Sequence, residues 1–366
     1  MQKKTTIRTM KKHAAWFAAP ALGLACLGAQ AQSSITLYGV VDNAIQRTTA
    51  GGFGSVTGLS TGGNATSRLG FRGSEDLGGG LKAGFWLEST LFTDSGTLGS
   101  GGMFFDRASY LSLGGHWGDL RLGRDYTPGF RAIVAADPFA YVGVGGIATA
   151  FNAAATTTFQ RAFGTGATTF ARSNNAIQYF TPKTLGGVYA ILAYAPREKT
   201  GNAGGYGHQA ARLGYAGGAL DISATAARTR IDATGEDFAV DSLAGSYRLG
   251  ALHLSASATQ TSYLSSRHNV MAVAARLQSG VHEFKASLAR VDQKGSNAAG
   301  AAIDADDARI LAMGYVHHLS KRTALYASAA HVANQGAATY GVPGGMTGAA
   351  GGRSSSGYDI GLRHNF

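Results

Sequence analysis

Arginines recur in this sequence at positions where guanidinium groups could attract and concentrate anions. In residues 68–72, Arg68 and Arg72 lie opposite Leu69 and Phe71, because successive side chains of an extended strand point to opposite faces. Further arginines follow at positions 121, 124, 131, 161 and 172. Between positions 126 and 172 the sequence has a single acid, Asp137. This excess of cations predicts a positive electrostatic potential that favours anions.

The sequence offers little for catalysis or for binding a cofactor. No G-x-S-x-G element marks a nucleophile. The glycine-rich residues 143–146 lack the strand, helix and Lys-Ser/Thr pair of a nucleotide site. His317 and His318 alternate on a predicted strand, so their rings point to opposite faces and cannot share a metal. We therefore expect no catalytic residue, no metal and no cofactor.

The elements that must position the arginines are short strands with one apolar face. Residues 252–259 place apolar side chains on even positions and polar ones on odd positions, and residues 220–225 and 81–88 repeat this pattern. Such segments recur from Ile35 to the end of the chain. We expect short turns at 75–80, 114–118, 182–187, 216–218, near 250, near 280 and at 319–322. We expect longer connections near 48–65, 92–103, 127–172, 197–205, 231–238, 294–305 and 335–353, with a tight one near 264–267.

These connections predict an all-β protein, a 16-stranded antiparallel transmembrane β-barrel. Short turns at one end and long loops at the other are typical of bacterial outer-membrane barrels, whose turns are periplasmic. An even strand number puts both termini on the periplasmic side. The connection 127–172, about 45 residues long, is too long for a simple loop, so we expect it to fold inward and narrow the lumen.

Both ends of the chain support export and membrane insertion. Residues 1–31 combine basic residues, a short apolar run and Ala29-Gln30-Ala31, the pattern of a cleaved signal peptide. The formal net charge of +11 then falls to +6 for residues 32–366, and the one cysteine, Cys26, is removed. The chain ends on an alternating strand whose last residue is Phe366. A transmembrane barrel can pair this strand with its first strand, so no free edge remains.

Several segments resemble Gram-negative porins of the neisserial and beta-proteobacterial type. The resemblance runs in the family's order through residues 35–42, 67–83, 122–128, 172–175, 319–323 and 363–366. It implies a trimeric diffusion channel constricted by its third loop, with the C-terminal Phe366 read by the barrel-assembly machinery. It also implies wall arginines that face acids on that loop, a pattern from which this chain departs because Asp137 is the only loop acid.

The constriction residues follow from alternation and from the resemblance together. A lipid-facing arginine at mid-depth costs about 2–4 kcal/mol, so Arg68 and Arg72 are expected to point into the lumen. The family motif places Arg124 on the pore wall, although strict alternation sends Arg121 inward instead. The expected constriction set is Arg68, Arg72, Arg124, Arg131, Asp137 and Arg161, and Asp42, Lys82, Glu88 and Arg172 are further lumen-facing candidates. Alternatively, Arg131 and Arg161 brace the loop against the wall by hydrogen bonds.

The expected function is passive diffusion of small hydrophilic solutes and ions across the outer membrane, with weak to moderate anion selectivity. A substrate-specific channel, a barrel enzyme and an adhesin are the alternatives. The expected partners are two further copies of the chain in a homotrimer, outer-membrane lipid and lipopolysaccharide, the barrel-assembly machinery, and the solutes and anions themselves. No nucleic acid is expected, because the arginines are scattered among strands and form no single basic stripe.

Overall fold

The structure, a computed structural model, describes residues 34–164, 166, 168–197, 206–344 and 348–366. The expected signal peptide 1–31 and most of the expected loop 197–205 lie outside these residues. The helices are α1 (Pro128–Ala136), the 3-10 helix η1 (Ile147–Phe151) and α2 (Thr157–Phe163). The strands are β1 (Ser34–Ala50), β2 (Gly54–Thr61), β3 (Arg68–Gly78), β4 (Leu81–Phe92), β5 (Thr97–Leu98), β6 (Ala108–Gly115), β7 (Gly118–Tyr126), β8 (Arg172–Phe180), β9 (Val188–Ala195), β10 (Gly207–Gly217), β11 (Leu220–Ile231), β12 (Glu236–Leu249), β13 (Leu252–Tyr263), β14 (Ser266–Ser279), β15 (His282–Gly295), β16 (Ala308–His318), β17 (Thr323–Asn334) and β18 (Ser355–Asn365).

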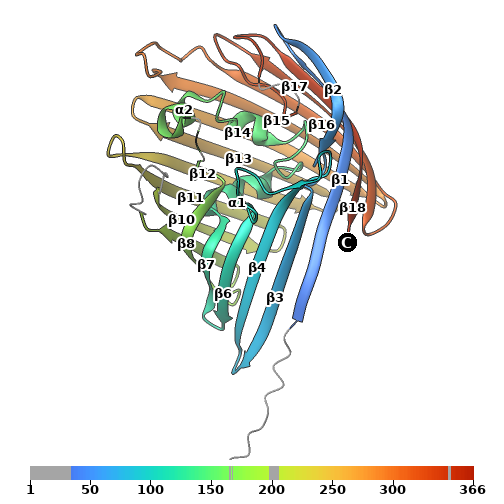
Figure 1. The fold of residues 1–366 in the computed structure, drawn as a ribbon, viewed down its shortest axis with the longest axis vertical. Coiled ribbons are helices and arrows are strands. Elements are labelled where there is room, and N and C mark those ends of the chain that lie inside the picture. Colours follow the sequence, from blue (N-terminus) through green and yellow to red (C-terminus); the bar gives the residue numbers. More distant parts are fainter. Residues whose placement is uncertain (1–33, 165, 167, 198–205, 345–347) are drawn as a thin grey trace, which may run out of the picture. The chain divides into compact units, whose positions relative to one another are not determined.

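The strands form one closed antiparallel barrel, as predicted (Figure 1). Neighbours in sequence pair with each other, and β18 returns to pair with residues 40–50 of β1. β3 pairs with the first half of β1 and β2 with the second half, so β2 and β3 together take the place of one barrel strand. β5 pairs only with β4, inside a loop. The barrel therefore has 16 strands.

Side chains along each strand alternate between an apolar outer face and a more polar inner face. On β6, Leu111 is 65% exposed outside the barrel while its neighbour Tyr110 is buried inside it. On β18, Ile360 is 69% exposed and Asp359 is buried. This period of two follows from strand geometry and gives the barrel an apolar outer belt.

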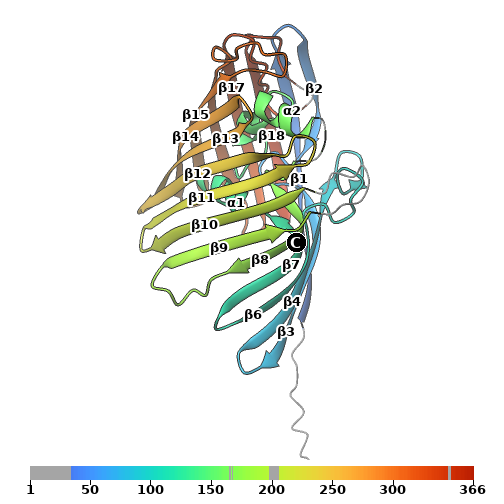
Figure 2. The ribbon, with the colours of Figure 1, turned by 90° about the vertical axis from the view of Figure 1, so that its left-hand side faces the viewer.

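The seven expected short turns all fall between consecutive strands of the structure. The expected loop 48–65 is different, because β1 continues to Ala50 and residues 54–61 form β2. These residues extend the β1–β2 hairpin beyond the point where β3 leaves the sheet. Figure 2 shows the next loop, between β4 and β6, projecting away from the barrel.

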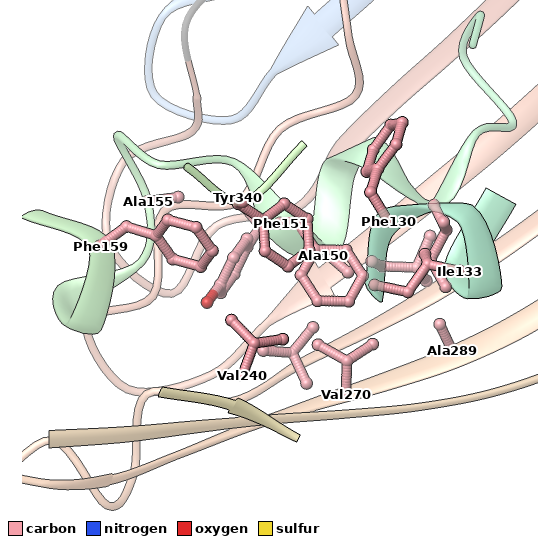
Figure 3. Packing of buried hydrophobic residues seen from close by; sticks show 14 of the residues in the cluster. Phe130, Ile133, Ala150, Phe151, Ala155, Phe159, Val240, Val270, Ala289 and Tyr340 are labelled. Atoms are coloured by element: carbon pink, nitrogen blue, oxygen red, sulfur yellow. The ribbon is translucent and has the colours of Figure 1, made fainter. Parts of the chain in front are cut away.

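The connection 127–171 folds into the lumen, where it carries α1, η1 and α2. Thr127 caps α1 by accepting the N–H of Phe130, and Pro128 begins the helix without an orphan N–H donor. The buried side chains of the loop form an apolar cluster with inward residues of the opposite wall, among them Val240 and Val270 (Figure 3). None of the helices in the described residues is long and apolar enough to cross a membrane.

The apolar cluster and a few polar contacts anchor the inward loop to the barrel wall. α1 packs on β9–β13, η1 on β15 and α2 on β13 and β14, and the N–H of Val144 donates to Asp359 of β18 at 3.3 Å. The aromatic rings of Phe151 and Phe170 stack at 4.8 Å, and Phe159 meets Phe170 edge to face at 5.2 Å. These contacts fix the loop across the lumen.

Candidate pore constriction

Glu88, inward on β4, gathers two arginines of the wall. Its carboxylate accepts a hydrogen bond from Arg107 Nε at 2.6 Å and one from Tyr38 Oη at 2.7 Å. Arg68 Nε lies 3.4 Å from the same carboxylate. Glu88 is buried, whereas the Arg68 side chain remains 31% exposed. The charge of Glu88 is therefore compensated by arginines of the wall, and part of the Arg68 side chain remains accessible from the lumen.

A second group of contacts joins Arg107 to Arg172, at the start of β8. Both guanidinium groups donate to Tyr126 Oη, at 2.7 Å and 2.9 Å, and Arg172 Nε donates to the carbonyl of Arg107 at 3.0 Å. The Arg172 guanidinium also lies over the Tyr126 ring, 4.4 Å from its centroid. With Arg68, this group holds three cations against the one carboxylate of Glu88. Its net charge is positive.

Alternation on β7 puts Arg121 inside the barrel and Arg124 outside it. The Arg121 guanidinium lies over the rings of Tyr110 and Phe180, 4.9 Å and 4.1 Å from their centroids. Arg124 pairs with Ser109, on the face of β6 that carries the exposed Leu111. The expected place of Arg124 on the pore wall is therefore wrong, and strict alternation is correct.

The chain around Arg124 explains why a motif match misleads there. β8 bulges between the partners of Gly123 and Asp125, with Asn175 at a φ of 51°. Arg124 donates to the side chain of Asn174 in this bulge at 2.5 Å and to the carbonyl of Asp106 at 2.7 Å. The irregularity thus lies in the partner strand and leaves the alternation of β7 intact.

Arg72 lies on the inner wall nearer the short turns. Its guanidinium is 5.4 Å from the ring centroid of Tyr38 and 5.9 Å from that of Trp86. A cavity of about 580 Å³ on this wall is lined by Arg72, Lys82 and Arg121, by aromatic side chains, and by Asp119, which pairs with Arg121 at 2.7 Å. Three cations and one acid therefore line the wall between the Glu88 group and the short turns.

Comparison with known proteins agrees with this architecture. A family model described as Gram-negative porin matches residues 18–337. The chain belongs to the Gram-negative porins. The outer membrane porin protein 32 of Delftia acidovorans is 39% identical over an alignment of 354 positions that covers 92% of this chain and 95% of that protein. The major outer membrane protein P.IB of Neisseria meningitidis serogroup A is 38% identical over an alignment of 112 positions that covers 28% of this chain and 32% of that protein.

A solved structure gives the same fold. The anion-selective porin from Comamonas acidovorans superposes with a TM-score of 0.78 at 36% identity, covering 92% of this chain and all of that one. The expected family and the expected 16-stranded barrel are confirmed. This porin is an outer-membrane channel, and its relatives are channels rather than enzymes.

Asp137 lies away from the pore, contrary to expectation. It follows α1 and is buried, with its carboxylate accepting the N–H groups of Phe139, Tyr141 and Ile147 at 3.0, 2.8 and 2.9 Å. Burial raises the pKa of the Asp137 carboxyl, although the three donors oppose the shift. Asp137 therefore shapes the inward loop of this porin and presents no charge to a passing ion.

Arg131 and Arg161 brace the loop, the alternative left open by the sequence. Arg131, on α1, pairs with Asp125 of β7 at 2.6 Å, and Arg121 contacts the same carboxylate at 3.0 Å. Arg161, on α2, donates to the side chain of Ser265 and to the carbonyl of Ser296, both at 2.8 Å. These two serines belong to connections at the long-loop end of the barrel. Arg161 is therefore a residue of the mouth and not of the constriction.

The remaining lumen candidates differ in their access to the pore. Lys82 is exposed on the inner wall, and Glu88 and Arg172 belong to the group described above. Asp42 is fully buried, and its carboxylate accepts the N–H groups of residues 63–65 and the hydroxyl of Tyr326. It holds the segment between β2 and β3 against β17.

Sequence reasoning missed Arg107, which connects Glu88 to Tyr126. It precedes the first residue of β6, Ala108, so strand alternation cannot place it. Its parity would have assigned it to the outer face with Ser109. The available signal was the neighbouring pair Asp106-Arg107 just before an amphipathic strand. Asp106 accepts from the backbone and hydroxyl of Thr90, at 2.7 Å each, which fixes this turn.

Proposed function

We propose that this porin is a passive diffusion channel for small hydrophilic solutes with a preference for anions. The observation that carries the proposal is the group of Arg68, Arg107 and Arg172 around a single carboxylate, Glu88. Cations that line a narrow, low-dielectric passage raise the local concentration of anions. The related anion-selective porin supports this preference.

The inward loop supports the anion preference because its one acid does not face the lumen. Its acid, Asp137, is occupied by three backbone N–H donors. Asp125, on β7 beside the loop, is shared by Arg121 and Arg131. Neither carboxylate is available to offset the wall arginines. An anion leaving the constriction would next meet Arg72 and Lys82.

We also propose that the channel assembles as a homotrimer. The loop between β4 and β6 projects outward, and Phe104 on it is 58% exposed (Figure 2). An exposed phenyl group on a projecting loop suits contact with a neighbouring copy. Recognition of Phe366 by the barrel-assembly machinery, cleavage after residue 31 and contact with lipopolysaccharide belong to the same proposal. Because a channel accounts for these features, we assign no catalytic role.

Reversal potential in a KCl gradient across a planar bilayer tests the anion preference. The wild-type porin should give a potential of the sign set by chloride, and Arg68→Ala/Arg172→Ala should move it toward zero. Arg228→Ala is the matched control, since Arg228 lies on the outer face of β11 and pairs with Asp241. A cation-selective wild type, or an unchanged double variant, would refute the role of the wall.

A further inference from the structure

Four cations lie together on the outer faces of β14–β16, near the long-loop end of the barrel. Arg267 of β14 stands directly opposite Lys294 of β15, and Arg290 of β15 stands directly opposite Arg309 of β16. Arg267, Arg290, Lys294 and Arg309 are all exposed. Lys294 and Arg290 lie four positions apart on one face of β15, about 13 Å along the strand.

Like charges directly opposite each other destabilise an antiparallel pair, so this arrangement favours a bound anion. Asp292 pairs with Lys294 at 3.1 Å, and Asp307 contacts Arg290 at 3.5 Å. Arg267 and Arg309 form no ion pair with any residue in the described part of the chain. Asp304 also lies beside Lys294, whose ammonium donates to the Asp304 carbonyl at 3.4 Å. The four cations therefore exceed these three acidic neighbours by one.

An apolar groove begins beside these cations on the outer surface. It has a volume of about 790 Å³ and runs over β11–β15, with Arg290 among its lining residues. Outward positions with small side chains, Gly245, Ala256 and Ala258, form part of its lining, between larger side chains such as Leu254. Met271, which pairs with Arg290, connects the cations to the groove. Cations at the end of an apolar groove suit a molecule with anionic head groups and hydrocarbon chains.

We propose that this outer face binds one phosphorylated, multiply acylated glycolipid of the outer leaflet, the lipid A part of lipopolysaccharide. The pairs Arg267/Lys294 and Arg290/Arg309 bind its two phosphates, which a disaccharide separates, and the groove takes an acyl chain. Arginine suits phosphate because its fork of donors binds two oxygens at once. The inference deepens the proposed contact with lipopolysaccharide and rests on the orientation of the long loops toward the outer leaflet.

Binding of purified lipid A to the folded porin in detergent, followed by native mass spectrometry, tests the site. Arg290→Ala/Arg309→Ala should weaken binding of bisphosphorylated lipid A at least about tenfold, because two charge-assisted contacts are lost. Lys183→Ala/Lys321→Ala, in turns at the other end of the barrel, removes the same charge and should change affinity less than about twofold. Lipid A stripped of its phosphates should bind all of these proteins equally weakly. Equal affinities for the wild type and the arginine variant would overturn the proposal.

A second variant tests the groove without removing charge. Ala256→Trp fills an outward position of the groove and should also weaken lipid A binding. A chelator of divalent cations should leave wild-type binding intact; if it abolishes binding, metal bridges through Asp292 and Asp307 hold the lipid, and the arginine site is refuted. Conductance and reversal potential of the same variants should match the wild type. Failure of the channel proposal would show in those electrical measurements, and failure of the lipid site only in the binding assay.

Discussion

At the level of single residues, Arg107 links the stability of the wall to its selectivity. Its side chain is 10% exposed and contacts both Glu88 and Tyr126. Removing one partner of a buried ion pair leaves the other charge uncompensated, at a typical cost of about 3–5 kcal/mol. Arg68 at 3.4 Å compensates Glu88 only in part. Arg107 therefore contributes to the stability of the folded barrel as well as to the electrostatic potential of the pore.

We expect Arg107→Ala to lower both the melting temperature and the ratio of anion to cation permeability. Arg107→Lys keeps the charge but loses the fork of donors, so it should keep most of the selectivity while still losing stability. Thermal unfolding in detergent and reversal potentials measure the two effects. An alanine variant that melts with the wild type would show that Glu88 does not need this partner.

Arg121 and Arg124 form a matched pair of variants on one strand. Both are arginines of β7, yet Arg121 is inward against Tyr110 and Arg124 is outward against Asn174. Arg121→Ala should reduce anion preference, because it removes a cation from the wall of the inner cavity. Arg124→Ala should leave reversal potentials unchanged. Equal effects of the two substitutions would contradict the alternation assigned here.

Alternation predicted single residues well only where strands are regular. It placed Arg68 and Arg72 on the inner face, because Leu69 and Phe71 mark the outer one. Extended to Arg107, which lies just before a strand, alternation gives the outer face, whereas the side chain contacts the inward Glu88. The role of Asp137 could not be predicted either. The sequence around a loop aspartate does not show whether its carboxylate binds the loop backbone or faces the pore.

At the level of elements, the strands were readable because their period of two is local, whereas the path of the inward loop depends on distant contacts. The length of the 127–172 segment predicted that it enters the lumen. Its contacts with Val240 and Val270 come from strands far along the chain, and no local pattern specifies them. β2 was missed because its glycines and threonines read as a loop.

The turn after α1 should make the loop's stability depend on pH. Burial raises the pKa of Asp137 above the value near 3.9 of an unfolded aspartate, so between the two values the folded porin holds a proton that the unfolded chain has lost. The contribution of Asp137 to the free energy of unfolding therefore rises as pH falls through this window. This contribution of Asp137 reaches its full size at pH values below the pKa of the unfolded aspartate.

Asp137→Asn removes this titration and one of the two acceptor oxygens. We expect it to destabilise the barrel by about 1–3 kcal/mol at neutral pH, because backbone N–H donors lose their partner. The difference in melting temperature between wild type and variant should grow from pH 7 to pH 4, since only the wild type gains from the proton. A constant difference across that range would mean that Asp137 titrates as it does in the unfolded chain.

At the level of the whole molecule, the barrel depends on one seam between the first and last strands. The sequence predicted that the terminal strand pairs with the first, since both are alternating and neither can be left as a free edge in a membrane. The structure adds how the seam closes. Gly39 and Phe366 exchange backbone hydrogen bonds, with N to O distances of 3.2 and 3.1 Å. The Phe366 ring covers Gly39, so a Cβ there would lie 2.3 Å from Phe366 Cζ and 2.7 Å from the Arg68 carbonyl oxygen.

Gly39→Val should therefore impair closure of the barrel. The ring can turn aside, but the Arg68 carbonyl belongs to the paired backbone of β3 and cannot. The fraction of protein that refolds to the compact, heat-modifiable form on a semi-native gel should fall.

Gly58→Val is the matched control, because nothing lies within 4 Å of its Cβ position. If Phe366→Ala restores folding of Gly39→Val, the ring is the obstacle; if it does not, the Arg68 carbonyl is. Full folding of Gly39→Val alone would show that the seam tolerates a side chain and that the packing of Phe366 on Gly39 does not control closure.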